Sequence, residues 1–213
     1  EALGVKLDIT PEKIAQCVEQ VGIGFMFAPM HHSCMKYAIG PRKELGVRTL
    51  FNLLGPLTNP ANASRQVLGV FDKQWLEPLA QVLQSLGTEH ALVVNAEDGL
   101  DEISIATATN ICELSDGNIK SYQVTPEDCG LTRSSLDNIK VNNVMDSANM
   151  ITSVLDGEAG SAADIVCLNA GAAIYVAGKA LSLKEGVQLA EKQLASKAAQ
   201  KTLAQLVEFT NKP

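Results

Sequence analysis

Two adjacent carboxylates stand where an α/β protein places its ligands. The apolar run Ala91 to Asn95 predicts a buried strand, and the loop Asp98-Gly99-Leu100-Asp101-Glu102 follows it. In open α/β sheets, ligands bind outside the carboxyl ends of the strands. Mg²⁺ takes one or two carboxylates and fills its shell with water and substrate phosphates. Asp101 and Glu102 are therefore candidate metal ligands, although the pair taken alone is explained more simply as two solvated side chains.

The segments around this loop predict an α/β protein with a mostly parallel sheet flanked by helices, because strands alternate with helices from residue 66 onward. The tetrapeptide Ser115-Asp116-Gly117-Asn118 predicts a hairpin. Strands are expected over 66–71, 90–95, 110–114 and 119–125, and helices over 75–86, 147–155, 162–179 and 196–209, with a further helix starting after Ser182 and one starting at Thr10-Pro11.

Composition excludes several classes of protein. The chain has 213 residues, 46% of them hydrophobic, and a net charge of −7. This charge argues against a nucleic-acid partner, because few cations are available to neutralise phosphates. There is no signal peptide and no apolar run long enough to span a bilayer, so no membrane partner is expected. The five cysteines are odd in number and form no CxxC pair, which fits a reducing cytoplasm.

A second segment is much more specific than the carboxylate pair. It contains Met30-His31-His32-Ser33-Cys34-Met35, Pro41-Arg42-Lys43-Glu44 and Phe51-Asn52-Leu53-Leu54-Gly55-Pro56. With the loop Gly99-Leu100-Asp101-Glu102 and the later run Leu168-Asn169-Ala170-Gly171, it resembles the anthranilate phosphoribosyltransferase family of the tryptophan pathway. The resemblance covers essentially the whole chain.

The resemblance implies an acceptor site for anthranilate. It gives Arg42 the role of holding the substrate carboxylate, which a guanidinium does with two parallel hydrogen bonds. It places His32 and Met35 along the acceptor channel, and Gly55-Pro56 in the pocket wall. From the residues alone, Arg42 could instead pair with Glu44 or Glu12, Met35 could be an ordinary packing residue, and Gly55-Pro56 would form a rigid turn in any case.

The resemblance also implies the reaction. A phosphoribosyl group passes from 5-phosphoribosyl 1-diphosphate to anthranilate, with Mg²⁺ held by Asp101 and Glu102. An arylamine needs little activation, so no residue must act as a strong general base, and His32 is the one candidate for a catalytic role. The family's glycine-rich phosphate loop has no equivalent in these 213 residues, which predicts that it lies upstream and that this polypeptide starts within a domain.

For domain organisation, the resemblance implies the nucleoside phosphorylase/phosphoribosyltransferase type of fold. Residues 1–21 would start the α/β domain, residues 22–65 would be a helical-domain segment with the acceptor site, and residues 66–213 would complete the α/β domain. The family's helical domain forms a homodimer. We expect the isolated 213 residues to dimerise poorly or aggregate, because a helical domain without its upstream helices exposes apolar surface.

Two other functions remain open at this point. Pyrimidine nucleoside phosphorylases are similar in fold, but their acceptor region differs from Phe51 to Pro56. A non-catalytic, nucleic-acid-binding paralogue of the same fold would need a basic groove, whereas the net charge here is −7.

Overall fold

The structure is a computed structural model that describes residues 1–27 and 51–212. Its strands are β1 (Arg65–Gly69), β2 (His90–Ala96), β3 (Thr109–Ser115) and β4 (Asn118–Val124). Its described helices are α1 (Pro11–Val21), α4 (Phe51–Leu57), α5 (Leu76–Ser85), α6 (Val144–Leu155), α7 (Ser161–Val176), α8 (Leu183–Ala195) and α9 (Ala198–Asn211), with 3-10 turns at Lys73–Trp75, Pro126–Cys129 and Leu136–Ile139.

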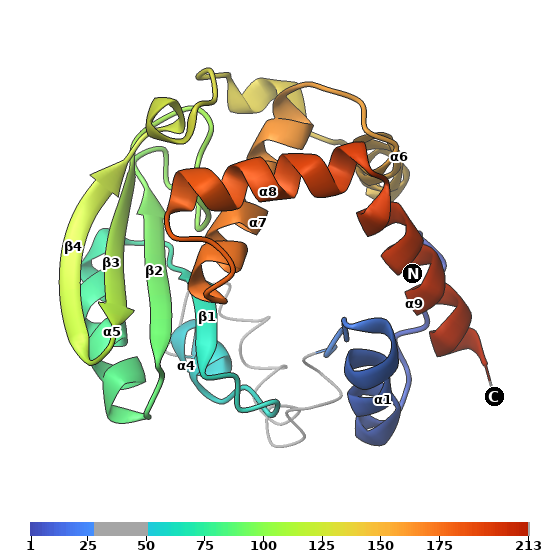
Figure 1. Cartoon of the computed structure of the whole chain (residues 1–213), viewed down its shortest axis with the longest axis horizontal. Coiled ribbons are helices and arrows are strands. Elements are labelled where there is room, and N and C mark those ends of the chain that lie inside the picture. Colours follow the sequence, from blue (N-terminus) through green and yellow to red (C-terminus); the bar gives the residue numbers. More distant parts are fainter. Residues whose placement is uncertain (28–50, 213) are drawn as a thin grey trace, which may run out of the picture.

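The described sheet has the order β1-β2-β3-β4, and it is mixed (Figure 1). Strands β1 and β2 are parallel, with Val67 opposite Leu92, whereas β2–β3 and β3–β4 are antiparallel. The α/β class is confirmed, but the expectation of a mostly parallel sheet is wrong for these strands. The connection between β2 and β3 contains no helix, so the chain returns beside β2 in the opposite direction.

The predicted hairpin is confirmed between β3 and β4. Asp116 and Gly117 both have positive φ, 49° and 75°, as the two central residues of a tight two-residue turn require. Ser115 and Asn118 are paired in the register of the two strands. The antiparallel pairing of β3 with β4 therefore follows from a short turn that can be recognised in the sequence.

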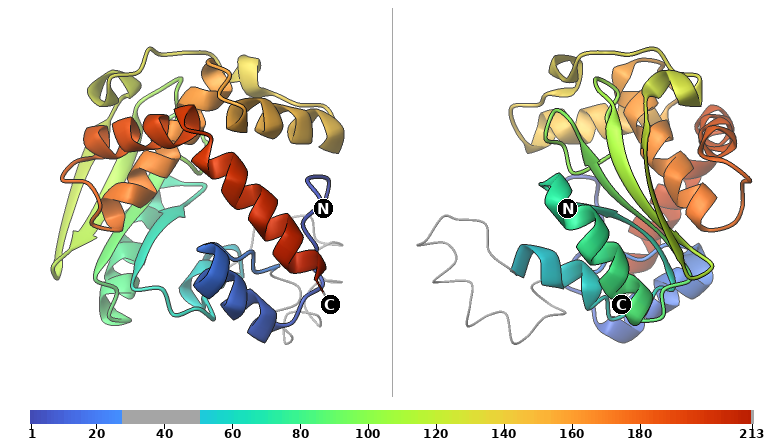
Figure 2. Two further views of the ribbon diagram at one scale, coloured as in Figure 1. Left: turned by 45° about the vertical axis from the view of Figure 1, so that its right-hand side comes forward. Right: turned by 90° about the vertical axis from the view of Figure 1, so that its left-hand side faces the viewer.

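Helices cover both faces of the sheet, and side chains alternate between them (Figure 2). On one face, α5 packs with Ala91 and Val93 of β2, while Leu92 and Val94 point to the opposite face, where α7 lies. All four side chains are buried. This two-sided burial is why β2 reads as an uninterrupted apolar run.

Local capping signals place several helix starts. The Thr10 hydroxyl accepts from the Lys13 backbone N–H at the start of α1, and the Ser182 hydroxyl accepts from the Glu185 N–H at the start of α8. Helix α6 begins at Val144, three residues before the predicted start, because the Asn143 side chain caps it. Among the described helices, none is both long and apolar enough to cross a membrane.

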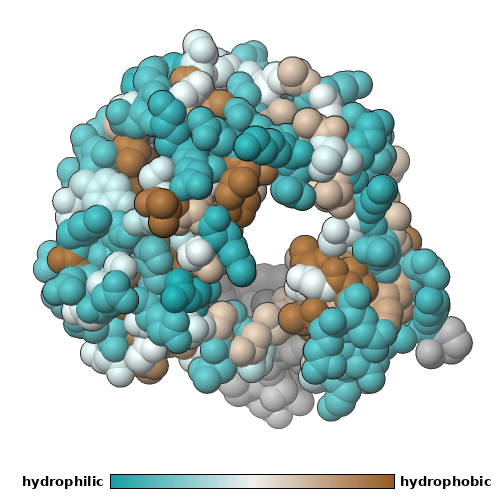
Figure 3. Space-filling model, in the orientation of Figure 1, coloured by the Kyte–Doolittle hydropathy of each residue, from teal (hydrophilic) through white to brown (hydrophobic). Residues whose placement is uncertain are grey.

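The first residues of the chain are tied to the last helix. The Lys6 backbone N–H donates to Thr210 Oγ1 at 3.2 Å, and Asn211 Nδ2 donates to the Gly4 carbonyl at 2.9 Å. Helix α1 packs on α9, away from the sheet (Figure 1). Figure 3 shows the hollow that this arrangement leaves between the α1 side and the sheet side of the described chain, with apolar side chains on its rim.

Candidate functional site

The loop after β2 presents Asp101 and Glu102 to solvent. Both residues are exposed, and no described residue forms a hydrogen bond or ion pair with either carboxylate. The loop is a tight turn: the Gly99 backbone N–H donates to the Ala96 carbonyl, and the Ala96 N–H donates to the Leu100 carbonyl, each at 3.0 Å. Gly99 has a φ of 88°, which explains the glycine at this position.

A close backbone contact places this loop against β1. A Cβ added to Gly69, the last residue of β1, would lie 1.6 Å from the Asp101 carbonyl oxygen. Only glycine admits such an approach, which is one reason for a glycine inside an apolar strand. The carboxylate pair therefore lies at the carboxyl ends of the two parallel strands, β1 and β2, as the sequence predicts from strand β2 alone.

The electrostatics of the pair suit a cation. Although the Glu102 side chain reaches solvent, neighbouring protein atoms partly desolvate its carboxylate, and this desolvation, followed by the charge of Asp101, raises the pKa of Glu102. A positive ion between the two groups would relieve this repulsion. Among the described residues, no group of three or more His, Cys, Asp and Glu side chains is arranged to hold a metal. Two adjacent carboxylates open to solvent fit Mg²⁺, which takes one or two carboxylates and keeps positions for water and phosphate oxygens.

Side-chain hydrogen bonds stiffen the rest of the loop. The buried Ser104 hydroxyl donates to Asp98 Oδ2 at 2.6 Å and accepts from the Ala106 backbone N–H at 2.9 Å. The Ser104 backbone N–H donates to Thr109 Oγ1 at 3.0 Å. Sequence reasoning assigned no role to Gly69 or Ser104. The isolated glycine in a strand is the signal that could have pointed to the first, whereas a serine in a loop carries no such signal.

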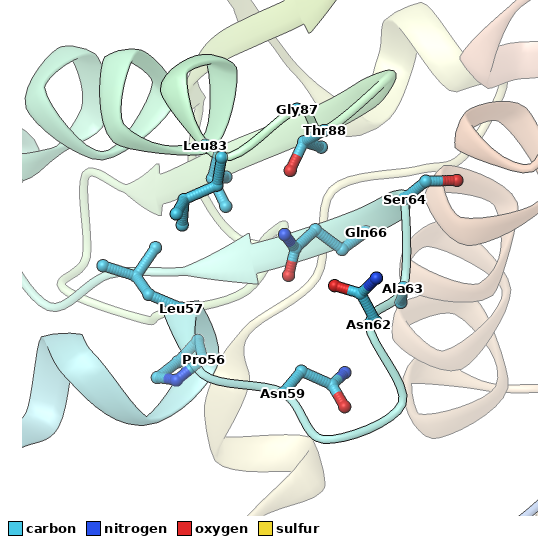
Figure 4. Close-up of a pocket in the computed structure, with 11 residues that line it drawn as sticks. Pro56, Leu57, Asn59, Asn62, Ala63, Ser64, Gln66, Leu83, Gly87 and Thr88 are labelled. Atoms are coloured by element: carbon cyan, nitrogen blue, oxygen red, sulfur yellow. The ribbon is translucent and has the colours of Figure 1, made fainter.

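The predicted acceptor residues are only partly within the structure. Arg42, His32 and Met35 lie outside the described residues. Gly55 and Pro56 belong to α4, and Pro56 lines a pocket of about 100 Å³ at the start of β1 (Figure 4).

This pocket is separate from the carboxylate pair. Its described lining has polar but uncharged side chains, including Asn59, Asn62 and Gln66, and contains no residue of the loop after β2. Pro56 shares this pocket with Ser64 and Gln66 at the start of β1, whereas the Asp101 carbonyl lies against Gly69, the last residue of β1. Of the predicted acceptor residues, only Gly55 and Pro56 lie within the described part of the chain, and Pro56 lines a pocket that the carboxylate loop does not reach.

Four of the five cysteines lie within the described residues. Cys17, Cys112, Cys129 and Cys167 are buried and free. Burial raises the pKa of the Cys129 and Cys167 thiols to about 11, which leaves them protonated and unreactive at neutral pH. They are core residues of this fold.

Comparison with known proteins shows the family of the chain. Residues 1–200 match the family described as "Glycosyl transferase family, a/b domain". The chain belongs to this family. The match includes both the loop that carries Asp101 and Glu102 and the segment that contains Arg42, so all the predicted site residues fall inside the family's domain.

Individual relatives are named for one activity. The chain is 58% identical over 210 residues to the anthranilate phosphoribosyltransferase of Thioalkalivibrio sulfidiphilus, a match that covers 99% of this chain and 62% of the relative. It is 44% identical to the crystal structure of the Thermus thermophilus enzyme of that name, with a TM-score of 0.91 over 99% of this chain and 63% of that one.

More distant structures show the same fold. Structures of the Saccharomyces cerevisiae anthranilate phosphoribosyltransferase are 24% identical, cover 98% of this chain and 60–61% of their own, and have TM-scores of 0.88–0.89. One is in complex with 4-fluoroanthranilate and another with PRPP and Mg. The chain spans about 62% of the length of the curated relatives it matches. These names do not favour the phosphorylase or the nucleic-acid-binding alternative.

Proposed function

We propose that this chain is the greater part of an enzyme that transfers a phosphoribosyl group from 5-phosphoribosyl 1-diphosphate to anthranilate, in tryptophan biosynthesis. The products are N-(5-phosphoribosyl)anthranilate and pyrophosphate. The observation that carries the proposal is the 58% identity to a protein of that name across 99% of this chain. The carboxylates of Asp101 and Glu102, exposed at the ends of β1 and β2 and without an ion-pair partner among the described residues, provide the oxygen ligands that a Mg²⁺-diphosphate would need.

On the donor side, Asp101 and Glu102 would hold Mg²⁺ together with the diphosphate. The fold-level relative in complex with PRPP and Mg supports this assignment. When bound, the cation neutralises negative charge that grows on the leaving pyrophosphate. The contribution of this chain is to keep two carboxylates side by side, exposed and free of competing ion pairs within its described part.

On the acceptor side, Arg42 would bind the anthranilate carboxylate, with His32 as a second donor. Met35, Gly55 and Pro56 would line the pocket around the aromatic ring. A fold-level relative in complex with 4-fluoroanthranilate supports an aromatic acid in this family's site. A charge-assisted hydrogen bond is worth about 1.5–3 kcal/mol, so a bidentate Arg42 would dominate acceptor affinity.

The transfer itself needs positioning more than proton abstraction. The bond from C1 of the ribose to the pyrophosphate oxygen breaks, and a bond from C1 to the anthranilate nitrogen forms. The nitrogen then loses one proton, either to solvent or to His32. Holding both reactants in line and stabilising the departing charge supply most of the rate gain.

The setting of the complete enzyme is part of the proposal. Residues 22–65 would form the helical-domain segment, with residues 1–21 and 66–213 in the α/β domain. The complete protein would be a homodimer that works in the cytoplasm. The free buried cysteines support a reducing compartment, and light scattering of the complete protein would test the dimer.

The decisive experiment follows anthranilate fluorescence with the complete protein, 5-phosphoribosyl 1-diphosphate and Mg²⁺. We expect a Mg²⁺-dependent loss of signal. Arg42→Ala should raise the anthranilate KM about tenfold or more and leave the KM for the donor nearly unchanged. Arg133→Ala is a matched control, because Arg133 is exposed and pairs only with Glu127 among the described residues.

A folded protein that leaves the fluorescence unchanged would overturn the proposal. Phosphorolysis of a pyrimidine nucleoside would then be measured, followed by a DNA-binding titration. An unchanged anthranilate KM in Arg42→Ala would refute the role of that residue alone.

A further inference from the structure

Helix α7 forms hydrogen bonds to the backbone that follows the carboxylate pair through the side chain of Asn169. The Ile103 backbone N–H donates to Asn169 Oδ1 at 2.9 Å, and Asn169 Nδ2 donates to the Ile103 carbonyl at 2.9 Å. Asn169 Nδ2 also donates to the Ile165 carbonyl one helical turn earlier, at 3.0 Å. An amide oxygen accepts and an amide nitrogen donates, so these bonds fix the amide in a single orientation.

The two hydrogen bonds with Ile103 satisfy both of its backbone polar groups, as pairing with a neighbouring strand would. Ile103 lies between β2 and β3, where it has no strand partner, and its side chain is buried in the main core. Buried backbone groups must be hydrogen bonded. By satisfying both the N–H and the C=O of one residue, Asn169 determines the position and the rotation of that part of the backbone.

Ile103 directly follows the carboxylate pair, so the loop is held on both sides. At the first residue of the pair, the Asp101 backbone carbonyl packs against Gly69 of β1. Directly after the pair, the Ile103 backbone forms two hydrogen bonds with the Asn169 side chain. Between these two supports, the Asp101 and Glu102 side chains remain exposed. A rigid backbone under free carboxylates is the arrangement that a preorganised cation site requires.

We propose that Asn169 is a positioning residue: through its two hydrogen bonds to Ile103, it orients Asp101 and Glu102 for binding the divalent cation. The inference rests on the proposed function, because it presupposes that these carboxylates bind a metal. It gives Asn169, which lies 66 positions after Ile103 in the sequence, a part in metal affinity that an amide side chain in a helix does not by itself suggest.

The test measures cation binding directly in the complete protein. Mn²⁺ takes the same oxygen ligands as Mg²⁺, and electron paramagnetic resonance reports free Mn²⁺ in the presence of 5-phosphoribosyl 1-diphosphate. For Asn169→Ala we expect the Mn²⁺ Kd to rise about 10–100-fold, as is typical when a supporting partner of metal ligands is lost. The Mg²⁺ concentration for half-maximal turnover should rise in parallel, while the anthranilate KM changes less than about twofold.

Two controls separate positioning from stability. Val176→Ala removes buried volume at the last residue of the same helix and leaves the Asn169 hydrogen bonds in place, and it should lower the unfolding temperature with little change in Mn²⁺ affinity. Asn211→Ala removes the same kind of bonds, from Asn211 Nδ2 to the Val207 carbonyl four residues earlier and to the distant Gly4 carbonyl. It should leave Mn²⁺ affinity unchanged.

Each outcome decides one claim. An Asn169→Ala protein with wild-type Mn²⁺ affinity, or a Val176→Ala protein that loses affinity equally, would refute the positioning role. The double variant Asp101→Asn, Glu102→Gln tests the underlying assignment. If that variant keeps wild-type affinity, the metal site of the proposed function is wrong and the role of Asn169 falls with it; if it loses affinity, the Asn169 result stands by itself.

Discussion

At the scale of single residues, the site depends on a close backbone contact that only a glycine at position 69 allows. Asp101 and Glu102 are ordinary exposed carboxylates, and their placement is what distinguishes them. The Asp101 carbonyl occupies the space that a side chain at residue 69 would fill. The missing Cβ of Gly69 therefore contributes as much to the geometry of the site as the carboxylates themselves.

Gly69→Ala should damage both stability and metal binding. The added Cβ would lie 1.6 Å from the Asp101 carbonyl oxygen, and a backbone group in a tight turn has little room to move. We expect a loss of about 1–3 kcal/mol in the free energy of unfolding, the usual cost of overpacking, together with weaker Mn²⁺ binding. Chemical denaturation and the Mn²⁺ titration measure the two effects.

Gly55→Ala is the control for the stability measurement, because a Cβ there meets no described atom within 4 Å. A Gly69→Ala protein as stable as Gly55→Ala, with unchanged Mn²⁺ affinity, would show that the contact is not needed.

At the scale of secondary-structure elements, a buried carboxylate joins the sheet to α7. Glu113 of β3 is fully buried, and its Oε1 accepts from His90 Nε2 of β2 at 2.9 Å and from the Tyr175 hydroxyl of α7 at 2.7 Å. Its Oε2 accepts from the Tyr122 hydroxyl at 2.9 Å and lies 3.2 Å from Lys120 Nζ, both on β4. One side chain thus links three strands and the helix that carries Asn169.

This network makes stability depend on pH. Burial by itself would raise the pKa of Glu113, but the hydrogen bonds from Tyr175, His90, Tyr122 and Lys120 outweigh it and hold the pKa below the ordinary value of 4.5. A carboxyl whose pKa is lowered by folding adds stability above its unfolded pKa, and this stability is lost as the pH falls through the folded pKa. Glu113→Gln should therefore cost about 2 kcal/mol or more at neutral pH and progressively less below about pH 4.5.

Tyr175→Phe sharpens this test, because it removes the hydrogen bond that lowers the pKa of Glu113 most. The folded pKa of Glu113 should then lie closer to its unfolded value, so the acid loss of stability should be smaller and be complete at a higher pH than in the unchanged protein. Urea unfolding between pH 3 and pH 7 measures both variants. Parallel curves for all three proteins would contradict the assignment of acid sensitivity to Glu113.

The contact between α7 and α8 is a second feature at this scale. A Cβ on Gly171 would lie 2.5 Å from the Val187 nitrogen, and a Cβ on Gly186 would lie 2.2 Å from the Gly171 carbonyl oxygen. The two helices therefore touch backbone to backbone. Such close packing explains why helix α7 tolerates a glycine in its interior, at a cost in helix propensity of about 1 kcal/mol relative to alanine.

The variant Gly171→Ala compares the gain in helix propensity with the cost of steric overlap between α7 and α8. Helix propensity favours alanine by about 1 kcal/mol, but overlap with the backbone of α8 costs about 1–3 kcal/mol and cannot be relieved by a rotamer change. We expect a net loss of stability and faster hydrogen exchange in both α7 and α8. A variant more stable than the unchanged protein would show that the helices separate at little cost.

At the scale of the whole molecule, the described chain leaves apolar surface uncovered. A groove of about 500 Å³ between the ends of α1 and α6 and the side of α9 is lined mainly by apolar residues, among them Ile23, Leu155 and Leu203. Ile23 and Phe25 are 47% and 52% exposed. Apolar patches of this kind promote association.

The 213 residues expressed by themselves should therefore bind the dye ANS and self-associate. Replacing Ile23 and Leu203, which both line the groove, by serine should lower ANS fluorescence about twofold and reduce the associated fraction seen by light scattering. Leu181→Ser is the control: Leu181 is 93% exposed but does not line the groove, so its loss should change little. A monodisperse 213-residue monomer that binds no ANS would contradict this prediction.

The sequence by itself determined the features that arise from local interactions. Strand and helix positions, the Asp116-Gly117 hairpin and the Thr10 and Ser182 caps follow from periodicity and from turn or cap residues close in the chain. The carboxylates at the end of β2 were predictable for the same reason. The resemblance supplied Arg42, His32 and Met35, which lie outside the described residues.

Only the tertiary structure decided which distant segments meet. Residues distant in sequence meet in three places: β3 pairs antiparallel with β2, Gly69 contacts the Asp101 backbone, and Asn169 forms hydrogen bonds with Ile103. The same holds for the separation of the Pro56 pocket from the carboxylate pair. No local pattern encodes such contacts, because each depends on the packing of a whole helix or strand against the sheet, and the entropic cost of closing the intervening loops rises only slowly with their length.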